Sequence, residues 1–450
     1  MRNKLRILAI TALLVAFHAA SGSALAEDRA LLELYRLAKT KDPLVGRAEA
    51  RLEAGRADKD IAMAALLPRV SANASVRELW TRVYDYAPAP ITGEYTGYSY
   101  GAGAALSLVN VPAYYQVSAA GAGISSAESG IHSARHDLIV RLLDGYVRYL
   151  KAKADEKLYR DELARVGKVL EQSQAFLTAG TGDVIAVYEA KARLDSAAAD
   201  LVKTEGQLRL AQQQLSSLAG VPVEAVKDIT VSRFAGPQPN DMEWWLETMR
   251  QHSPALLQAS QDLAQAEQSR KSASAGHYPT VSGNGGYTVD KGSTFLPNVE
   301  TQQWYVGMQL NLPIYAGGDT TARTRRAMAG EAERRAMLYD AREQGIRRTK
   351  EAFLNLQYNA SLVEAYQRKH ESAELQLKAV QKGRDIGTRT AIDLLNAEQT
   401  FAISRRDLAA GMYDNLQRRL ELKAAAGILT EEDLVELGGE AAEAEKAAVK

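Results

Sequence analysis

The strongest constraint on the fold is that the sequence is written twice. The segment from Asp42 aligns without a gap with the segment from Ser253, at an offset of 211 residues. Further along, the best alignment has an offset of 207. Two halves of about 200 residues therefore share one architecture. The matched pairs are Pro43 with Pro254, Leu52 with Leu263, Pro68 with Pro279, Val70 with Val281, Asn73 with Asn284, Gly180 with Gly387, Thr181 with Thr388, Ala190 with Ala397, Leu215 with Leu422 and Gly220 with Gly427.

The first 26 residues differ from the rest. Arg2, Lys4 and Arg6 precede the apolar stretch "ILAITALLVAF", and "ALA" at 24–26 fits a cleavage site of small residues. This pattern is typical of a secretory signal peptide, with a mature chain starting at Glu27. The 450-residue chain has no cysteine, so we expect no lipid anchor on a cysteine and no disulfide bonds.

The remaining residues divide into four expected parts. Residues 27–225 form the first structural repeat, 226–241 a linker with a short strand before a Gly/Pro break, and 242–436 the second repeat. Residues 437–450 are expected to be a disordered tail. The 55 basic residues are balanced by 55 acidic residues, which argues against a nucleic-acid partner. The arginine-rich run at 323–348 has acids interleaved at helical spacing and is typical of a solvated helix face.

Within each repeat, the pattern predicts a helix, two strands, a very long helix and a further helix. Leucines recur every seven residues at Leu194, Leu201, Leu208 and Leu215, with alanine along the alternate seam, as in a coiled coil with small knobs. From Pro112 to Leu177 nothing except tolerated glycines interrupts a helical pattern. Such a helix is roughly 100 Å long, so it is not the core of a compact domain.

Two segments in each half switch to a period of two, which predicts strands with one apolar face. In the clearest of them, Trp304, Val306, Met308 and Leu310 alternate with polar or small residues. Strands of about ten residues with this pattern are typical of an outer-membrane barrel, with this stripe facing lipid. The alternative is a soluble antiparallel sheet that covers a core. Four strands per chain cannot close a barrel in lipid, so we expect several chains to share one, and three chains would supply twelve strands.

In this order and duplicated, several motifs make the chain resemble the TolC family of outer-membrane channel proteins. They are "LLPRVSANAS", "HYPTVSGNGG", "LNLPIYAGGDTTAR" and "GTRTAIDLLNAEQT", and the resemblance covers residues 27–437. It implies a mainly α fold with a β membrane part: a homotrimer with an α-helical periplasmic barrel of coiled-coil hairpins and a shared 12-stranded β-barrel in the outer membrane. It also implies docking to a periplasmic adaptor protein and an inner-membrane transporter.

The motif "GTRTAIDLLNA" matches the family's periplasmic entrance, where an arginine and two aspartates line the constriction. Arg389 matches the arginine and Asp393 the first aspartate, whereas the second aspartate position holds Asn396. The motif in this chain therefore does not predict a double ring of acids. In the first repeat, Ala186 stands at the position that corresponds to Asp393. The alternative for Asp393 is a carboxylate that caps the first helical turn.

The resemblance also implies that the exposed turns meet the adaptor. The docking residues would be Gly180, Thr181, Gly182, Gly387 and Thr388. From the residues alone, each glycine is expected to end a helix and each following threonine to cap the next one.

We therefore expect a trimeric exit duct of a drug-efflux or type I secretion system in the outer membrane. The alternative is a non-conducting exported coiled-coil scaffold that spans the periplasm. Catalysis has little support: there is no phosphate loop or nucleophile elbow, and His132 and His136 lack the glutamate of a zinc-protease motif. We expect two surface histidines rather than a zinc pair, no enzyme activity and no cofactor or metal.

Overall fold

A computed structural model describes residues 31–83, 91–223, 236–292, 299–435 and 437. The expected signal peptide at 1–26, linker residues 226–235 with their short strand, and tail residues 438–450 lie outside the described part. Leu437, expected in the tail, is described and buried.

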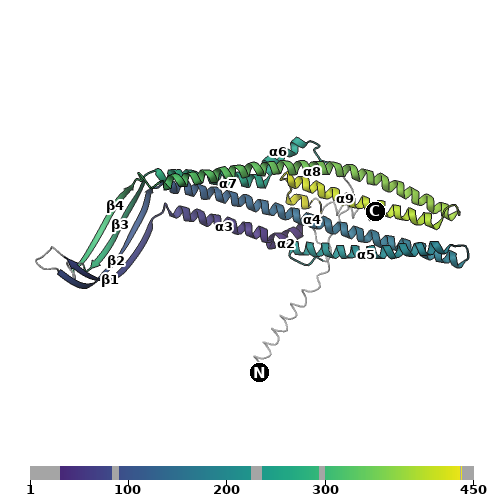
Figure 1. The fold of residues 1–450 in the computed structure, drawn as a ribbon, viewed down its shortest axis with the longest axis horizontal. Coiled ribbons are helices and arrows are strands. Elements are labelled where there is room, and N and C mark those ends of the chain that lie inside the picture. The colour runs from purple at the N-terminus through teal and green to yellow at the C-terminus, as the bar shows by residue number, and fades with distance from the viewer. Residues whose placement is uncertain (1–30, 84–90, 224–235, 293–298, 436, 438–450) are drawn as a thin grey trace, which may run out of the picture. The chain divides into compact units, whose positions relative to one another are not determined.

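Each half of the chain contributes two helices, two strands and two further helices in the same order, so the single helix expected before the strands is in fact a pair (Figure 1). The very long helix predicted from Pro112 to Leu177 is present as α4, and the second half has its counterpart in α8. The first half contains α2 (Leu31–Lys41), α3 (Pro43–Ala64), β1 (Arg69–Val83), β2 (Ile91–Val109), α4 (Val111–Thr178) and α5 (Val184–Ala219). The second contains α6 (Met242–His252), α7 (Pro254–Ser274), the short 3-10 helix η1 (Ala275–His277), β3 (Thr280–Lys291), β4 (Glu300–Asn311), α8 (Asp319–Asp385) and α9 (Ala391–Ala425).

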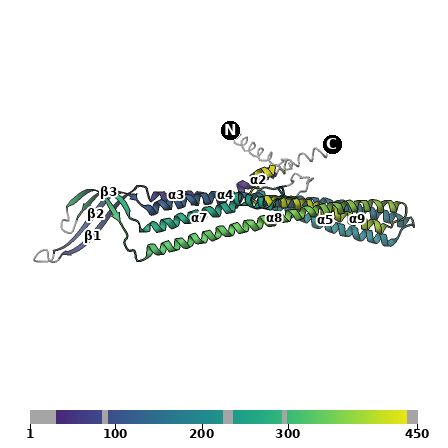
Figure 2. The ribbon, with the colours of Figure 1, turned by 90° about the horizontal axis from the view of Figure 1, so that it is seen from above.

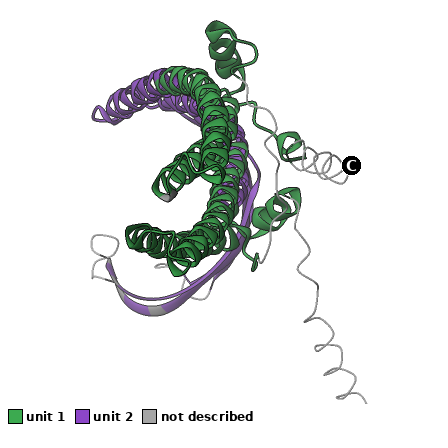
Figure 3. Ribbon diagram, turned by 90° about the vertical axis from the view of Figure 1, so that its right-hand side faces the viewer, with its two compact units in different colours: residues 1–47, 132–253, 344–450 green, residues 48–131, 254–343 purple. Residues whose placement is uncertain are grey.

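The chain forms two compact units that cut across the two repeats (Figure 3). Unit 1 comprises residues 1–47, 132–253 and 344–450, and unit 2 comprises 48–131 and 254–343. Each unit thus takes segments from both halves, and the repeat boundaries stay a prediction.

Unit 2 contains one antiparallel sheet in the order β1-β2-β3-β4, and two views show its strands side by side (Figures 1 and 2). The pairing of β2 with β3 joins the two halves of the chain. Successive side chains of a strand point to opposite faces, so the register defines two surfaces. One row is small or apolar, with Val70, Ala104, Gly285 and Val306; another, on the opposite face, carries Asn73, Gly101, Thr288 and Gln303.

The predicted stripe on β4 lies on the apolar face of this sheet. Val306 is 95% exposed within a single chain, and Trp304, Met308 and Leu310 are exposed as well. Gln303 and Gln309 occupy the alternate positions. β1 and β4 each have one neighbour, so both edges of the sheet are open in the single chain.

Unit 1 has a core of side chains from several helices. Tyr35 of α2, Tyr146 of α4 and Leu215 of α5 are almost fully buried in it. Along α5, however, the residues buried at seven-residue spacing are Ala190, Ala197, Thr204 and Ala211. The predicted heptad spacing is present, but small residues occupy the centre of the seam, and Leu194 and Leu201 are only half-buried beside it. Small side chains let the packed helices approach closely.

A second core in unit 1 is built around α6. Asp241 caps this helix by accepting a hydrogen bond from the backbone N–H of Glu243 at 3.0 Å. Trp245 then packs against Phe353 and Leu356 of α8. No helix in the described part of the chain is long and apolar enough to cross a membrane.

Candidate functional site at the helical turns

The turns after α4 and α8 have the same backbone geometry. Gly180 and Gly387 adopt φ of 73° and 78°, in the left-handed region that favours glycine. Thr181 donates its backbone N–H to the Phe176 carbonyl at 3.0 Å, and Thr388 donates to the Gly383 carbonyl at 2.8 Å. Both turns are therefore Schellman motifs, which satisfy the last carbonyl groups of the long helices.

The expectation that the two threonines cap the following helices is wrong. The hydroxyls of Thr181 and Thr388 donate backwards, to the carbonyls of Phe176 at 3.3 Å and Gly383 at 2.9 Å. The caps of α5 and α9 lie two residues further on, at Asp183 and Thr390. Because the Schellman motif requires one residue after the glycine, the cap residue comes later than the sequence suggests.

Asp393 forms a capping box with Thr390 at the start of α9. Its carboxylate accepts hydrogen bonds from the Thr390 backbone N–H at 3.0 Å and from the Thr390 hydroxyl at 2.9 Å. These two bonds, with the Arg389 charge nearby, lower the pKa of Asp393 below its usual range. The carboxylate is thus fixed in position and remains charged at neutral pH.

Arg389 is exposed beside this carboxylate. Its aliphatic stem lies against Gly383, where an added Cβ would meet the Arg389 Cγ at 2.7 Å. The ion pairs between described residues do not include Arg389. Its guanidinium instead acts at longer range on the Asp393 carboxylate, whose pKa it helps to lower.

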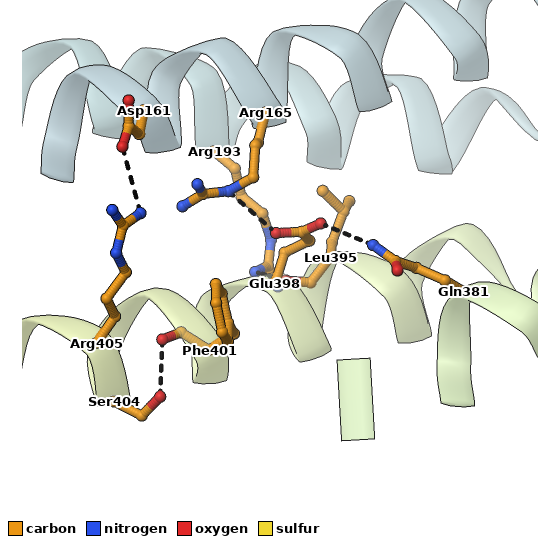
Figure 4. A network of polar contacts seen from close by, with 9 residues as sticks. All are labelled: Asp161, Arg165, Arg193, Gln381, Leu395, Glu398, Phe401, Ser404 and Arg405. Atoms are coloured by element: carbon orange, nitrogen blue, oxygen red, sulfur yellow. Dashed lines mark hydrogen bonds and ion pairs between the residues drawn. The ribbon is translucent and has the colours of Figure 1, made fainter. Parts of the chain in front are cut away.

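Asn396 is held by an arginine from the other half of the chain. Arg193 of α5 donates to the Asn396 side-chain oxygen at 2.7 Å and to the Gln399 side-chain oxygen at 2.8 Å. It also donates to the Leu395 carbonyl at 3.1 Å, and Figure 4 shows Arg193 reaching toward Leu395. Sequence reasoning missed Arg193, since nothing in its local pattern points to a partner 203 residues away.

Behind these contacts lies a polar seam between α4 and α9. Arg165 forms an ion pair with Glu398 at 3.3 Å, Gln381 approaches the other carboxylate oxygen at 3.5 Å, and Arg405 pairs with Asp161 at 3.2 Å (Figure 4). A cavity of about 230 Å³ adjoins the pair, lined on α5 by Arg193 and Asp200. Burial raises the pKa of Glu398, with Arg165 opposing that shift.

This raised pKa predicts how the stability of the seam depends on pH. A folded-state pKa above the unfolded value means that the folded protein binds this proton more tightly. The stability is then fully present below the unfolded pKa and declines as pH rises through the folded pKa. Melting temperatures of wild type and Glu398→Gln, measured from pH 7 down to pH 4, should therefore diverge in favour of the wild type as pH falls. If the melting temperatures of the two proteins changed with pH by the same amount, this prediction would be wrong.

No group of three or more His, Cys, Asp or Glu side chains in the described part of the chain could hold a metal ion. Burial lowers the pKa of His136, which is half-buried rather than on the surface as expected, whereas His132 is exposed.

The chain is similar to known exit channels along nearly its whole length. The family described as "Outer membrane efflux protein" matches residues 34–221 and 245–428. The outer membrane protein TolC of Vibrio cholerae serotype O1 is 28% identical over 424 residues, covering 90% of this chain and 92% of the relative. The alkaline protease secretion protein AprF of Pseudomonas aeruginosa is 27% identical, covering 90% and 85%.

Solved structures share the fold at lower identity. The outer-membrane channel OprN matches with a TM-score of 0.77 and 20% identity, over 89% of this chain and 91% of that one. CusC matches with a TM-score of 0.77 and 17% identity, over 89% and 92%. Because the family match spans both halves of the duplicated chain, the protein belongs to the outer membrane efflux protein family, as an outer-membrane exit duct for efflux or type I secretion with a periplasmic helical part.

Proposed function

We propose that the duct is passive and gated at the turn between α8 and α9, with Asp393, Arg389 and Asn396 lining the narrowest part of a trimeric channel. The observation that supports this most is the contrast between the repeats. Asp393 is held in place and charged, whereas its counterpart Ala186 is 8% exposed and packed inside. A trimer has three copies of Asp393, one from each chain, arranged around one axis. A ring of three carboxylates favours cations.

We also propose that Gly180, Thr181, Gly182, Gly387 and Thr388 meet a periplasmic adaptor, which links the duct to an inner-membrane transporter. In Gly182, an added Cβ would lie 2.6 Å from the Leu177 nitrogen, so only glycine keeps that turn tight. Apolar side chains beside the first turn are exposed and offer contact area to helices of a partner. They are Phe176 at 51%, Ile185 at 56% and Tyr188 at 68%.

The stripe of Trp304, Val306, Met308 and Leu310 is proposed to face lipid. Met308→Arg should then lower the yield of assembled trimer, because a charge near the bilayer midplane costs about 2–4 kcal/mol on the lipid side of a barrel. Gln309→Arg is the matched control, since the neighbouring side chain points to the polar face. Trimer yields from native gels test this, and equal yields for the two variants would contradict the assignment of the apolar face to lipid.

Purified trimers in planar bilayers test the gate as a whole. We expect a small resting conductance that is blocked by a multivalent cation such as hexaamminecobalt(III) added from the periplasmic side. Trimers that give no conductance under any condition would instead favour the exported scaffold.

A further inference from the structure

The segment between β4 and α8 exposes large apolar side chains that nothing in the described chain covers. Ile314 is 92% exposed and Tyr315 is 87% exposed. Pro313 lacks a backbone N–H and stops the ladder, and Gly317 and Gly318 turn the chain at φ of 62° and 84°. Removing apolar side chains of this size from water is favourable, so an assembled protein gains stability by covering them.

The first repeat contains the same segment in a different setting. "NVPAY" at Asn110–Tyr114 corresponds to "NLPIY" at Asn311–Tyr315, so Ala113 takes the place of Ile314. Ala113 is only 4% exposed and lies in the first turn of α4, which follows the inner strand β2. The bulky, exposed Ile314 thus follows the edge strand β4, beside which the described chain places no further strand.

The opposite edge of the sheet carries a second uncovered apolar group. Ile61 near the end of α3 is 70% exposed, and Leu67 just before β1 is 54% exposed. β1 begins where β4 ends, so both groups lie at the same end of the sheet. Two strands separate them, and three strand spacings amount to roughly 14 Å, so they do not meet within one chain.

We propose that Ile314 and Tyr315 pack against Ile61 and Leu67 of the next copy of this chain, forming an apolar collar at the junction of strands and helices. Copies related by rotation around a closed ring join opposite edges, so a patch on one edge meets a different patch on the other. The contact would continue the strand pairing that closes a barrel between β4 of one copy and β1 of the next. The proposal rests on the trimer described above but not on its gate.

The absence of cysteine from the chain makes disulfide trapping a direct test. Leu67→Cys combined with Ile314→Cys should convert the trimer to a covalent trimer on denaturing gels after mild oxidation. Ile61→Cys with Tyr315→Cys tests a second facing pair. A disulfide needs Cα atoms within about 7 Å, so a bond within one chain is excluded by the strand spacing.

Leu67→Cys with Trp304→Cys is the matched control. Trp304 lies on the same edge strand, seven residues and roughly 23 Å before the end of β4. This pair of cysteines should therefore give no covalent trimer. Native gels before oxidation show that each variant assembles.

Assembled, conducting trimers in which neither facing pair crosslinks would overturn the collar and leave the gate intact. Quenching by brominated lipid of a bimane label attached to the single variant Ile314→Cys would likewise overturn it, because the side chain would then face the bilayer. Crosslinked trimers without block by multivalent cations would support the collar and contradict the gate.

Discussion

Exchanging Asp393 for alanine is expected to weaken block of the resting channel by hexaamminecobalt(III) by about tenfold or more, since in the proposed gate three carboxylates on one axis each attract the same ion. Cation selectivity should fall with it. The Thr390 hydrogen bonds lower the pKa of Asp393, whereas repulsion among three carboxylates in the proposed ring raises it, so the pH at which wild-type block is lost shows which effect is larger. Single-channel recordings in planar bilayers measure both effects.

Two controls separate the charge of Asp393 from its capping role. Asp393→Asn keeps an oxygen that accepts from the Thr390 N–H but removes the charge, so it should lose block like alanine. Thr390→Ala removes the hydroxyl of the capping box and leaves the charge, so block should remain. If block follows the capping box rather than the charge, Asp393 does not face the pore.

The contact with Arg193 changes what is expected of Asn396. From the family motif alone, Asn396→Asp would rebuild a second acid ring and strengthen block. The Arg193 guanidinium is 2.7 Å from the Asn396 oxygen, however. The negative charge of an aspartate at this position would therefore be offset by the positive charge of Arg193.

The second large effect is expected from Arg193 itself. Arg193→Ala removes three hydrogen bonds between α5 and α9, to Leu395, Asn396 and Gln399. Bonds from a charged donor contribute about 1.5–3 kcal/mol when buried, but two of these are exposed and one is partly buried, so we expect a combined loss of about 1–2 kcal/mol. If these bonds hold the turns closed, the resting conductance should rise severalfold in bilayer recordings.

Arg193→Lys is the matched variant, because an ammonium keeps the charge but cannot serve the three acceptors in one plane. The resting conductance of Arg193→Lys should lie between those of the wild type and Arg193→Ala. Asn396→Ala in the Arg193→Ala background should add little, since the shared bond is already absent. Unchanged conductance in Arg193→Ala with intact trimers would show that this contact does not hold the turns closed.

Local pattern was enough to predict most of the elements. The alternation at Trp304, Val306 and Met308 predicted β4, and uninterrupted helical spacing from Pro112 predicted α4 almost to its last residue. These succeed because strand faces and long coiled-coil helices repeat one simple period. The exposed turns at Gly180 and Gly387 were recognisable because a left-handed residue ending a helix favours glycine.

Contacts between distant segments were not predictable. Nothing in the sequence near Arg193 indicates Asn396, and nothing near β2 indicates that it pairs with β3 rather than with another strand. The caps at Asp183 and Thr390 were missed for a local reason, because the bonds of Thr181 and Thr388 to the preceding helix depend on turn geometry. The short strand expected in the linker falls on residues outside the described part of the chain, so it stays a prediction.

The two open edges of the sheet have a genetic consequence. In the proposed trimer, a chain whose β1 edge is damaged still presents a sound β4 edge, so it can recruit normal copies and then fail to close the ring. When such a mutant is expressed together with the wild type in equal amounts, most rings contain at least one defective chain. Edge mutations should therefore be dominant, whereas mutations that prevent the chain from folding at all should be recessive.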